Sequence, residues 1–173
     1  MDFNTEENRK ALIGFFPHLG SDCRFELLSG QTPVYNCIAW AMGYSDRWVD
    51  TEHSPGHWWP AGVKRSTEPQ ALFDAFVAEG FEKADDGRFE KGYDKVVLFQ
   101  KDGEWTHASR IESNDVEYSK FGGSFDGVHS HHIFTGSIYG EEYAYLRRKT
   151  TTKPVASATP QGSIKINLDN LIF

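Results

Sequence analysis

The sequence lacks long hydrophobic runs and dense basic clusters. No apolar stretch approaches the roughly 20 residues that cross a bilayer, so we expect no membrane partner. The start of the chain lacks the basic and then apolar regions of a secretory signal, which predicts a cytoplasmic protein. Delivery to another cell as an effector is the alternative, and nothing in the first twenty residues supports it. The formal net charge is -7 and the longest basic run is Arg147-Arg148-Lys149, which argues against a nucleic-acid partner.

Cysteine is also scarce. The chain has two cysteines, Cys23 and Cys37, which allow a single disulfide. A chain of this size without an export signal usually keeps its thiols reduced, so we expect both cysteines to be free.

The length of 173 residues fits one domain of ordinary size, which we place at residues 1–149. Residues 150–163 have the composition of a linker and no periodicity. In residues 164–173 the first half alternates between polar and apolar side chains, which predicts a strand. This tail could pack on its own domain or bind a protein partner by adding to that partner's sheet.

The pattern of apolar residues predicts helices followed by antiparallel strands, which is an α+β fold. We expect one helix from Asn4 or Thr5 to Pro17, a short one from Cys37 to Gly43, and one from Ser66 or Thr67 to Gly80. Beyond these helices the period changes to two, and strands are expected at residues 95–100, 104–112, 116–121 and 142–147. The turns Asp102-Gly103 and Ser113-Asn114-Asp115 would join the first three strands.

Cys37 is a candidate nucleophile because of its place on the second helix. It follows Asn36, which can cap the helix, and so stands in the first turn. The free N–H groups and the positive dipole end of a helix stabilise an anion. The sequence therefore predicts a thiol pKa below the free value of about 8.5.

His107 is the candidate base, and the strand register predicts where it points. A two-residue turn at Asp102-Gly103 places Leu98 opposite His107 and Val96 opposite Ser109. The face of the strand that carries His107 then also carries Trp105 and Ile111, and we expect helices to cover it. A single inward histidine is more often a satisfied core residue. If the Cys37 helix covers this face, however, thiol and imidazole could come within hydrogen-bond reach.

The third strand should supply a group that orients the imidazole. If Ser113 pairs with Val116, Lys120 points inward with His107, whereas a one-residue bulge brings Ser119 inward instead. Of the two side chains, only Ser119 can accept a hydrogen bond from an imidazole N–H. The third position is therefore either Ser119 or Lys120.

Several motifs resemble an uncharacterised bacterial family marked by Y-N-C-I-A-W-A-x-G. They are Tyr35-Asn36-Cys37-Ile38-Ala39-Trp40-Ala41, Trp59-Pro60, Thr106-His107-Ala108, Ser119-Lys120-Phe121-Gly122 and Tyr139-Gly140, with Phe121 in place of the family's leucine and His129 at its later histidine. A cysteine at a helix start followed by a histidine on an antiparallel strand also resembles the papain-like superfamily, which includes NlpC/P60 amidases and transglutaminases.

The papain-like resemblance implies a Cys-bearing helix packed on an antiparallel sheet. It also implies a hydrolase or acyltransferase that acts on an amide bond in a protein or peptide, as a peptidase, amidase or deamidase. Gln31 stands six residues before Cys37, the papain spacing for an oxyanion-hole glutamine, beside the backbone N–H of Cys37 as a second donor. We add Asn36, Trp59 and His129 as residues expected to line the substrate site.

Two rival functions remain open. His129, His131 and His132 lie within four residues, and His53 and His57 recur four apart, which raises the question of zinc. Because consecutive histidines point in different directions on any regular element, we expect no metal and no cofactor. The other rival is a non-enzymatic protein-interaction module, for which the acidic surface, the Trp58-Trp59 loop and the tail would be suited.

Overall fold

The computed structural model describes residues 2–151. Its helical segments are α1 (Glu6–Phe15), the 3-10 helix η1 (Pro17–Ser21), α2 (Cys37–Met42) and α3 (Pro69–Ala78). Its strands are β1 (Glu26–Leu27), β2 (Trp48–Val49), β3 (His57–Trp58), β4 (Glu82–Ala84), β5 (Tyr93–Lys101), β6 (Glu104–Ser113), β7 (Val116–Lys120), β8 (Asp126–Ser130) and β9 (Glu141–Lys149). The predicted tail strand, and all but the first two residues of the predicted linker, lie outside the described residues.

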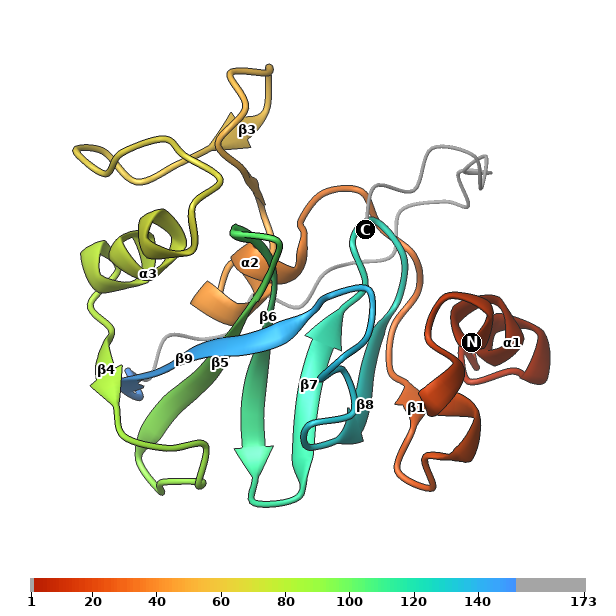
Figure 1. Cartoon of the computed structure of the whole chain (residues 1–173). Coiled ribbons are helices and arrows are strands. Elements are labelled where there is room, and N and C mark those ends of the chain that lie inside the picture. The colour runs from red at the N-terminus through yellow and green to blue at the C-terminus, as the bar shows by residue number, and fades with distance from the viewer. Residues whose placement is uncertain (1, 152–173) are drawn as a thin grey trace.

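A seven-stranded sheet organises these elements, in the order β1-β8-β7-β6-β5-β9-β4 (Figure 1). Each neighbouring pair in it is antiparallel, whereas β2 and β3 form a separate parallel pair. In Figure 1, α1 lies at the β1 end of the sheet and α3 at the β4 end. The predicted α+β class is confirmed. None of the helices formed by residues 2–151 is long and apolar enough to cross a membrane.

The helices begin and end where local signals predict. The Thr5 hydroxyl caps α1 by accepting from the N–H of Asn8 at 3.2 Å. Gly43 ends α2 in the left-handed region, with φ of 92°, which a glycine adopts without strain. The third helix begins at Pro69, slightly later than predicted, because Pro supplies a preset φ at the first helical position.

Successive residues of β5 bury their side chains in two different clusters, one on each face of the sheet. Val96 and Leu98 belong to the cluster formed with α2 and α3, together with residues such as Ile38, Met42, Leu72, Phe76, Ala108 and Leu146. Val97 and Phe99 belong to the other, which is rich in rings and includes Phe16, Phe25, Ile111, Phe121, Phe125, Phe134 and Tyr139. We call these the helix-side cluster and the aromatic cluster.

A β-bulge in the β5–β6 hairpin changes the predicted register. Lys101 pairs with Glu104 as predicted, but a shift beyond Gln100 places Phe99, and not Leu98, opposite His107. Val97 likewise replaces Val96 opposite Ser109. Thr106 is the extra residue of the bulge, so Trp105 packs against the helix-side cluster and no longer shares a face with His107.

The bulge also corrects the expectation that helices cover the face of His107. The His107 ring lies against Phe99, Phe134 and Tyr139, in the aromatic cluster, whereas α2 packs on the neighbouring residue Ala108. The covering of His107 therefore comes largely from the segment between β8 and β9.

A second irregularity decides which residue of β7 shares the face of His107. Ser113 pairs with Val116 as predicted, but the register then shifts, and Ile111 pairs with Glu117 instead of Tyr118. This one-residue bulge is the alternative that predicts Ser119, and not Lys120, on the inward face, and it brings Ser119 next to His107. The ladder between β6 and β7 ends at the pair Arg110–Tyr118. Helix α2 contacts both strands.

Candidate functional site

Cys37 is the first residue of α2, and Asn36 fixes that helix start. The Asn36 Oδ1 accepts from the N–H of Ala39 at 3.0 Å and from the N–H of Val49 at 3.3 Å. Its Nδ2 donates to the Val49 carbonyl at 2.7 Å. The amide is fully engaged within the fold, so it positions the cysteine and does not line an open substrate site as predicted.

The Cys37 thiol is buried, with 8% of the residue exposed. Burial raises the pKa of the thiol to about 11, although the backbone N–H of Ala108 and the positive charge of Lys120 act in the opposite direction. The predicted depression of the pKa is therefore wrong. A six-residue helix offers a modest dipole, and in this environment the loss of hydration outweighs it.

His107 is fully buried and engaged at one ring nitrogen. Its Nε2 lies 3.1 Å from the Ser119 Oγ, whereas its Nδ1 is buried without a hydrogen-bond partner. The Tyr139 ring stacks on the imidazole, and the ring of Phe134 meets it edge-on. Burial lowers the pKa of His107 well below its ordinary value, and a charge on His129 would lower it further. The imidazole is therefore neutral near pH 7.

Ser119 joins a set of buried polar groups on the aromatic side of the sheet. Its Oγ lies 2.8 Å from the Ser109 Oγ and 2.8 Å from the Nε2 of His129. The other ring nitrogen of His129, Nδ1, lies 3.1 Å from the Ser130 carbonyl oxygen. His129 is fully buried, so the prediction that it lines an open substrate site is wrong.

Cys37 belongs to the helix-side cluster and the His107 ring lies in the aromatic cluster, so the two side chains are connected through the residues around them. The backbone N–H of Ala108, which directly follows His107, lowers the pKa of the thiol, as do those of Ile38 and of Cys37 itself. Tyr139 stacks on His107, and burial raises its pKa well above the ordinary value, with a further increase from the charge of a Cys37 thiolate. No hydrogen bond joins the thiol to the imidazole, because Nδ1 has no partner.

Lys120 lies near the thiol, and not in the polar set around His107. Its Nζ donates to the carbonyls of Gly122, at 2.9 Å, and Ser124, and lies over the ring of Tyr35. Burial lowers the pKa of Lys120 to about 8, opposed by the charges of Asp126 and of a Cys37 thiolate. Ser119, and not Lys120, is therefore the residue that contacts the imidazole.

Asp126 lies near Lys120 and binds the hydroxyl of Tyr35. One carboxylate oxygen, Oδ2, accepts from the hydroxyls of Tyr35 and Ser29, each at 2.7 Å. Burial raises the pKa of Asp126, although these hydrogen bonds and the charge of Lys120 lower it. Tyr35, directly before Asn36 in the motif, is thereby anchored to β8.

The remaining predicted residues lie apart from the thiol or inside the core. Gln31 is exposed, and its amide donates to the Ser124 hydroxyl at 3.5 Å. Trp59 is buried and stacks on Trp105, with 6.1 Å between ring centroids. The structure therefore does not place the Gln31 amide on the sulfur of Cys37, and it makes Trp59 a core residue.

The adjacent histidines that raised the question of zinc bind acidic side chains instead. His131 pairs with Glu117, and His132 with Glu142. Within residues 2–151, no group of three or more His, Cys, Asp or Glu side chains could hold a metal ion.

Tyr139 and Ser109 are members of the site that the sequence analysis did not single out. Tyr139 lies in the segment before β9, far from His107 in the sequence, and only the Tyr139-Gly140 motif pointed to it. Ser109 shares a strand face with His107 by period two, so the alternation of β6 could have identified it.

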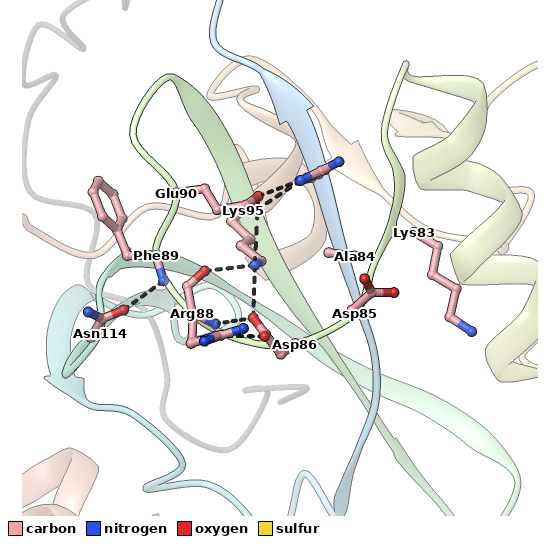
Figure 2. A pocket seen from close by; sticks show the side chains of 10 residues that line it. Lys83, Ala84, Asp85, Asp86, Arg88, Phe89, Glu90, Lys95 and Asn114 are labelled. Carbon is pink, nitrogen blue, oxygen red and sulfur yellow. Dashed lines mark hydrogen bonds and ion pairs between the residues drawn. The ribbon is translucent and has the colours of Figure 1, made fainter.

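A polar cavity of about 370 Å³ lies elsewhere, beside the loop between β4 and β5 (Figure 2). Its charged side chains bind one another: Lys95 contacts Asp86, and Arg147 binds both carboxylate oxygens of Glu90. The lining residues do not include Cys37 or His107. This cavity is therefore separate from the candidate site.

Comparison with known proteins gives a family but no function. No curated protein and no solved structure matches the chain. A family profile described as a domain of unknown function, DUF7689, matches residues 26–147. This range contains Cys37, His107, Ser119 and His129. Because the match covers more than half of the sequence, the chain belongs to the DUF7689 family.

Proposed function

We propose that this protein is a cysteine-dependent hydrolase or acyltransferase that acts on an amide bond. Cys37 is the nucleophile, His107 is the base and Ser119 orients the imidazole. The observation that carries the proposal is the asymmetry of the His107 ring: Ser119 holds Nε2, while Nδ1 is buried and unpartnered. The backbone N–H of Ala108, the residue after His107, lowers the pKa of the thiol.

An unpartnered buried nitrogen supports a functional role because it is costly. Leaving a buried polar atom without a hydrogen bond costs about 1–3 kcal/mol, and such atoms are few in native proteins. A nucleophile, a base and a third group that orients the base are the parts that covalent catalysis needs. In the proposed site the free nitrogen of His107 receives the thiol proton.

The resting site holds a neutral thiol and a neutral imidazole, because burial raises the pKa of Cys37 and lowers that of His107. As the sulfur attacks the carbonyl carbon, the S–H proton moves to the Nδ1 of His107. The resulting imidazolium protonates the departing amine, and an acyl-enzyme remains on Cys37. Water or a second amine then attacks the acyl carbon and transfers a proton to His107, which frees the thiol.

The order of the site residues supports a papain-like relationship as part of this proposal. A cysteine begins a helix, a histidine follows on an antiparallel strand, and a polar residue stands on the next strand. The backbone N–H of Cys37 would serve as an oxyanion donor, and Gln31 would have to leave Ser124 to serve as a second. We propose a protein or peptide substrate, whose binding must uncover a thiol that is 8% exposed.

The burial of Cys37 favours a second function, that of a non-enzymatic interaction module. A small buried thiol with a pKa of about 11 also fits a residue that serves only to pack α2 on Ala108. The two functions differ in one respect: only the enzyme needs His107 to activate the sulfur.

A small acyl donor tests this difference. The protein is treated with p-nitrophenyl acetate at pH 7.5, and acetylation of Cys37 and Cys23 is followed by peptide mass spectrometry. We expect His107→Ala to slow acetylation of Cys37 by about 10²- to 10⁴-fold. The rate at Cys23, which is exposed, serves as an internal reference and should not change.

His132→Ala is the matched control, because His132 lies in the segment between β8 and β9, its side chain is 55% exposed, and it binds Glu142. It should leave both rates unchanged. Equal rates at Cys37 with and without His107, or no acetylation of Cys37 in the native protein, would contradict the enzyme and favour the interaction module.

A further inference from the structure

We infer that His129 is a positioning residue that fixes the tautomer of His107 through the hydroxyl of Ser119. A series of hydrogen bonds runs from the Ser130 carbonyl through His129 and Ser119 to His107. Its catalytic meaning rests on the function proposed above. Its consequence is that the unpartnered Nδ1 of His107 carries a lone pair and no proton.

The backbone carbonyl of Ser130 sets the donor-to-acceptor direction of these hydrogen bonds. The Nδ1 of His129 lies 3.1 Å from the Ser130 carbonyl oxygen, and a carbonyl can only accept, so this nitrogen carries a proton. Burial lowers the pKa of His129, opposed by the charges of Glu117 and Asp22, so the buried ring is neutral near pH 7. A neutral imidazole has one N–H, which leaves Nε2 of His129 as an acceptor.

The Ser119 hydroxyl transmits this direction. Its Oγ lies 2.8 Å from the Nε2 of His129, and since that nitrogen has no proton, the hydroxyl must be the donor. A hydroxyl has one proton and two acceptor positions. The Ser119 oxygen can therefore only accept from its other neighbours, the Ser109 hydroxyl at 2.8 Å and the Nε2 of His107 at 3.1 Å.

The last step sets the state of His107. Because its Nε2 donates to Ser119, this nitrogen carries the single proton of the neutral ring. Nδ1, buried and without a partner, is left with its lone pair. In the opposite tautomer, Nδ1 would hold an unsatisfied N–H and could not accept a proton from Cys37.

His129 acts through Ser119 and does not touch a substrate, since it is fully buried. Its role is to keep the hydrogen bonds of Ser119 and His107 in one donor-to-acceptor direction. An aromatic ring without nitrogen would fill the same space, yet it would let the Ser119 hydroxyl rotate and donate to His107. We therefore expect His129→Phe to allow both tautomers of His107, with little change in packing.

NMR of the ¹⁵N-labelled full chain measures the tautomer directly, from the two ring-nitrogen shifts of His107 and their couplings to the ring protons. We expect a protonated Nε2 and an unprotonated Nδ1 in the native protein at pH 7.5. In His129→Phe, the ratio of this tautomer to the other should fall about tenfold, the effect of losing one ordinary hydrogen bond. His129→Gln, whose side-chain carbonyl can accept from Ser119, should restore the ratio.

A protonated Nδ1 on His107 in the native protein would overturn the inference without any variant. An unchanged ratio in His129→Phe would also overturn it, since the backbone anchor would then have no influence. These outcomes are independent of acetylation at Cys37. If the tautomer is as inferred but His107→Ala acetylates normally, the proposed function fails and the positioning role of His129 stands.

Discussion

The ring of Tyr139 lies flat on the imidazole of His107, with 3.9 Å between the ring centroids and 5° between the planes. The carbonyl of Tyr139 accepts from the Thr106 hydroxyl at 2.5 Å, and Thr106 is the residue that the β6 bulge adds. The bulge thus connects β6 to the segment that covers His107. Phe134 closes another side of the imidazole, with an interplanar angle of 81°.

We expect the stacked ring of Tyr139, and not its hydroxyl, to hold the imidazole plane. Tyr139→Leu should slow acetylation of Cys37 by about 3- to 10-fold, the range that corresponds to the loss of one stacked aromatic pair. Tyr139→Phe keeps the stack and is the matched control, so its rate should stay within about twofold of the native rate. A loss of rate in the phenylalanine variant equal to that in the leucine variant would assign the effect to the hydroxyl.

The pKa of Cys37 predicts the pH dependence of its alkylation. Only the thiolate reacts with iodoacetamide, so with a pKa of about 11 the rate at Cys37 should rise about tenfold per pH unit between pH 7 and 10. Native protein is alkylated across this range, and each cysteine is quantified by mass spectrometry. At pH 7, exposed Cys23 should react before buried Cys37. A plateau at Cys37 between pH 6 and 8 would instead reveal a thiolate stabilised by the helix.

Lys120→Met tests the electrostatic part of that pKa. The Lys120 charge lowers the pKa of the thiol, so its removal should slow alkylation of Cys37. Because the pKa of Lys120 is itself about 8, the difference from the native protein should be largest below pH 8 and diminish above it. A constant difference at every pH would indicate that the variant alters access to the sulfur and not its charge environment.

The sequence predicts those parts of the fold that depend on local chemistry. Asn36 caps α2 and Gly43 ends it, and the turn at Asp102-Gly103 pairs Lys101 with Glu104, as predicted. Each of these signals acts within a few residues of the chain, where capping and turn preferences are decisive. The class of the fold follows from the same signals and the change of period.

The sequence does not predict the bulge at Thr106, and it leaves the bulge that brings Ser119 inward as one of two alternatives. No residue within two positions of Thr106 is a glycine, and the extra residue is accommodated by a contact with Tyr139, which lies far along the chain. The Cys37 pKa was predicted with the wrong sign for a related reason. The helix dipole can be read from the sequence, whereas the burial that outweighs it arises from tertiary packing.

The buried pair of Glu117 and His131 predicts a stability that depends on pH. The Glu117 carboxylate accepts a hydrogen bond from the His131 ring, which raises the pKa of His131 above its ordinary value of about 6.5. Stability from this pair is therefore fully present below about pH 6.5 and is lost as pH rises through the pKa of the folded state. We expect Glu117→Gln to reduce the free energy of unfolding by about 2 kcal/mol at pH 6, with a smaller effect at pH 9.

Urea unfolding of the native protein and the variant from pH 5.5 to 9 measures this difference. Glu6→Gln is the control, because Glu6 pairs with Lys10 on the surface of α1, where both side chains are largely exposed. Its effect should be below about 0.5 kcal/mol and should not depend on pH in this range. A difference for Glu117→Gln that grows with pH would show that the carboxylate does not stabilise a protonated His131.

A comparison of alanine variants at Gly140 and Gly136 distinguishes backbone strain from a close contact next to the site. Both have a positive φ, of 82° and 77°, so alanine at either position should cost about 1 kcal/mol. A Cβ at Gly140 would lie 2.9 Å from the carbonyl carbon of Gln100 and closer still to its oxygen, whereas at Gly136 its nearest neighbour is 3.9 Å away. Gly140→Ala should therefore unfold at a clearly lower urea concentration than Gly136→Ala. Gly140→Ala should also slow acetylation of Cys37, because the segment before β9 must move away from Gln100 and would shift Tyr139 off the imidazole of His107. Equal unfolding midpoints for the two variants would show that the backbone before β9 adjusts at Gly140 without strain, and that Tyr139 is held by its own contacts.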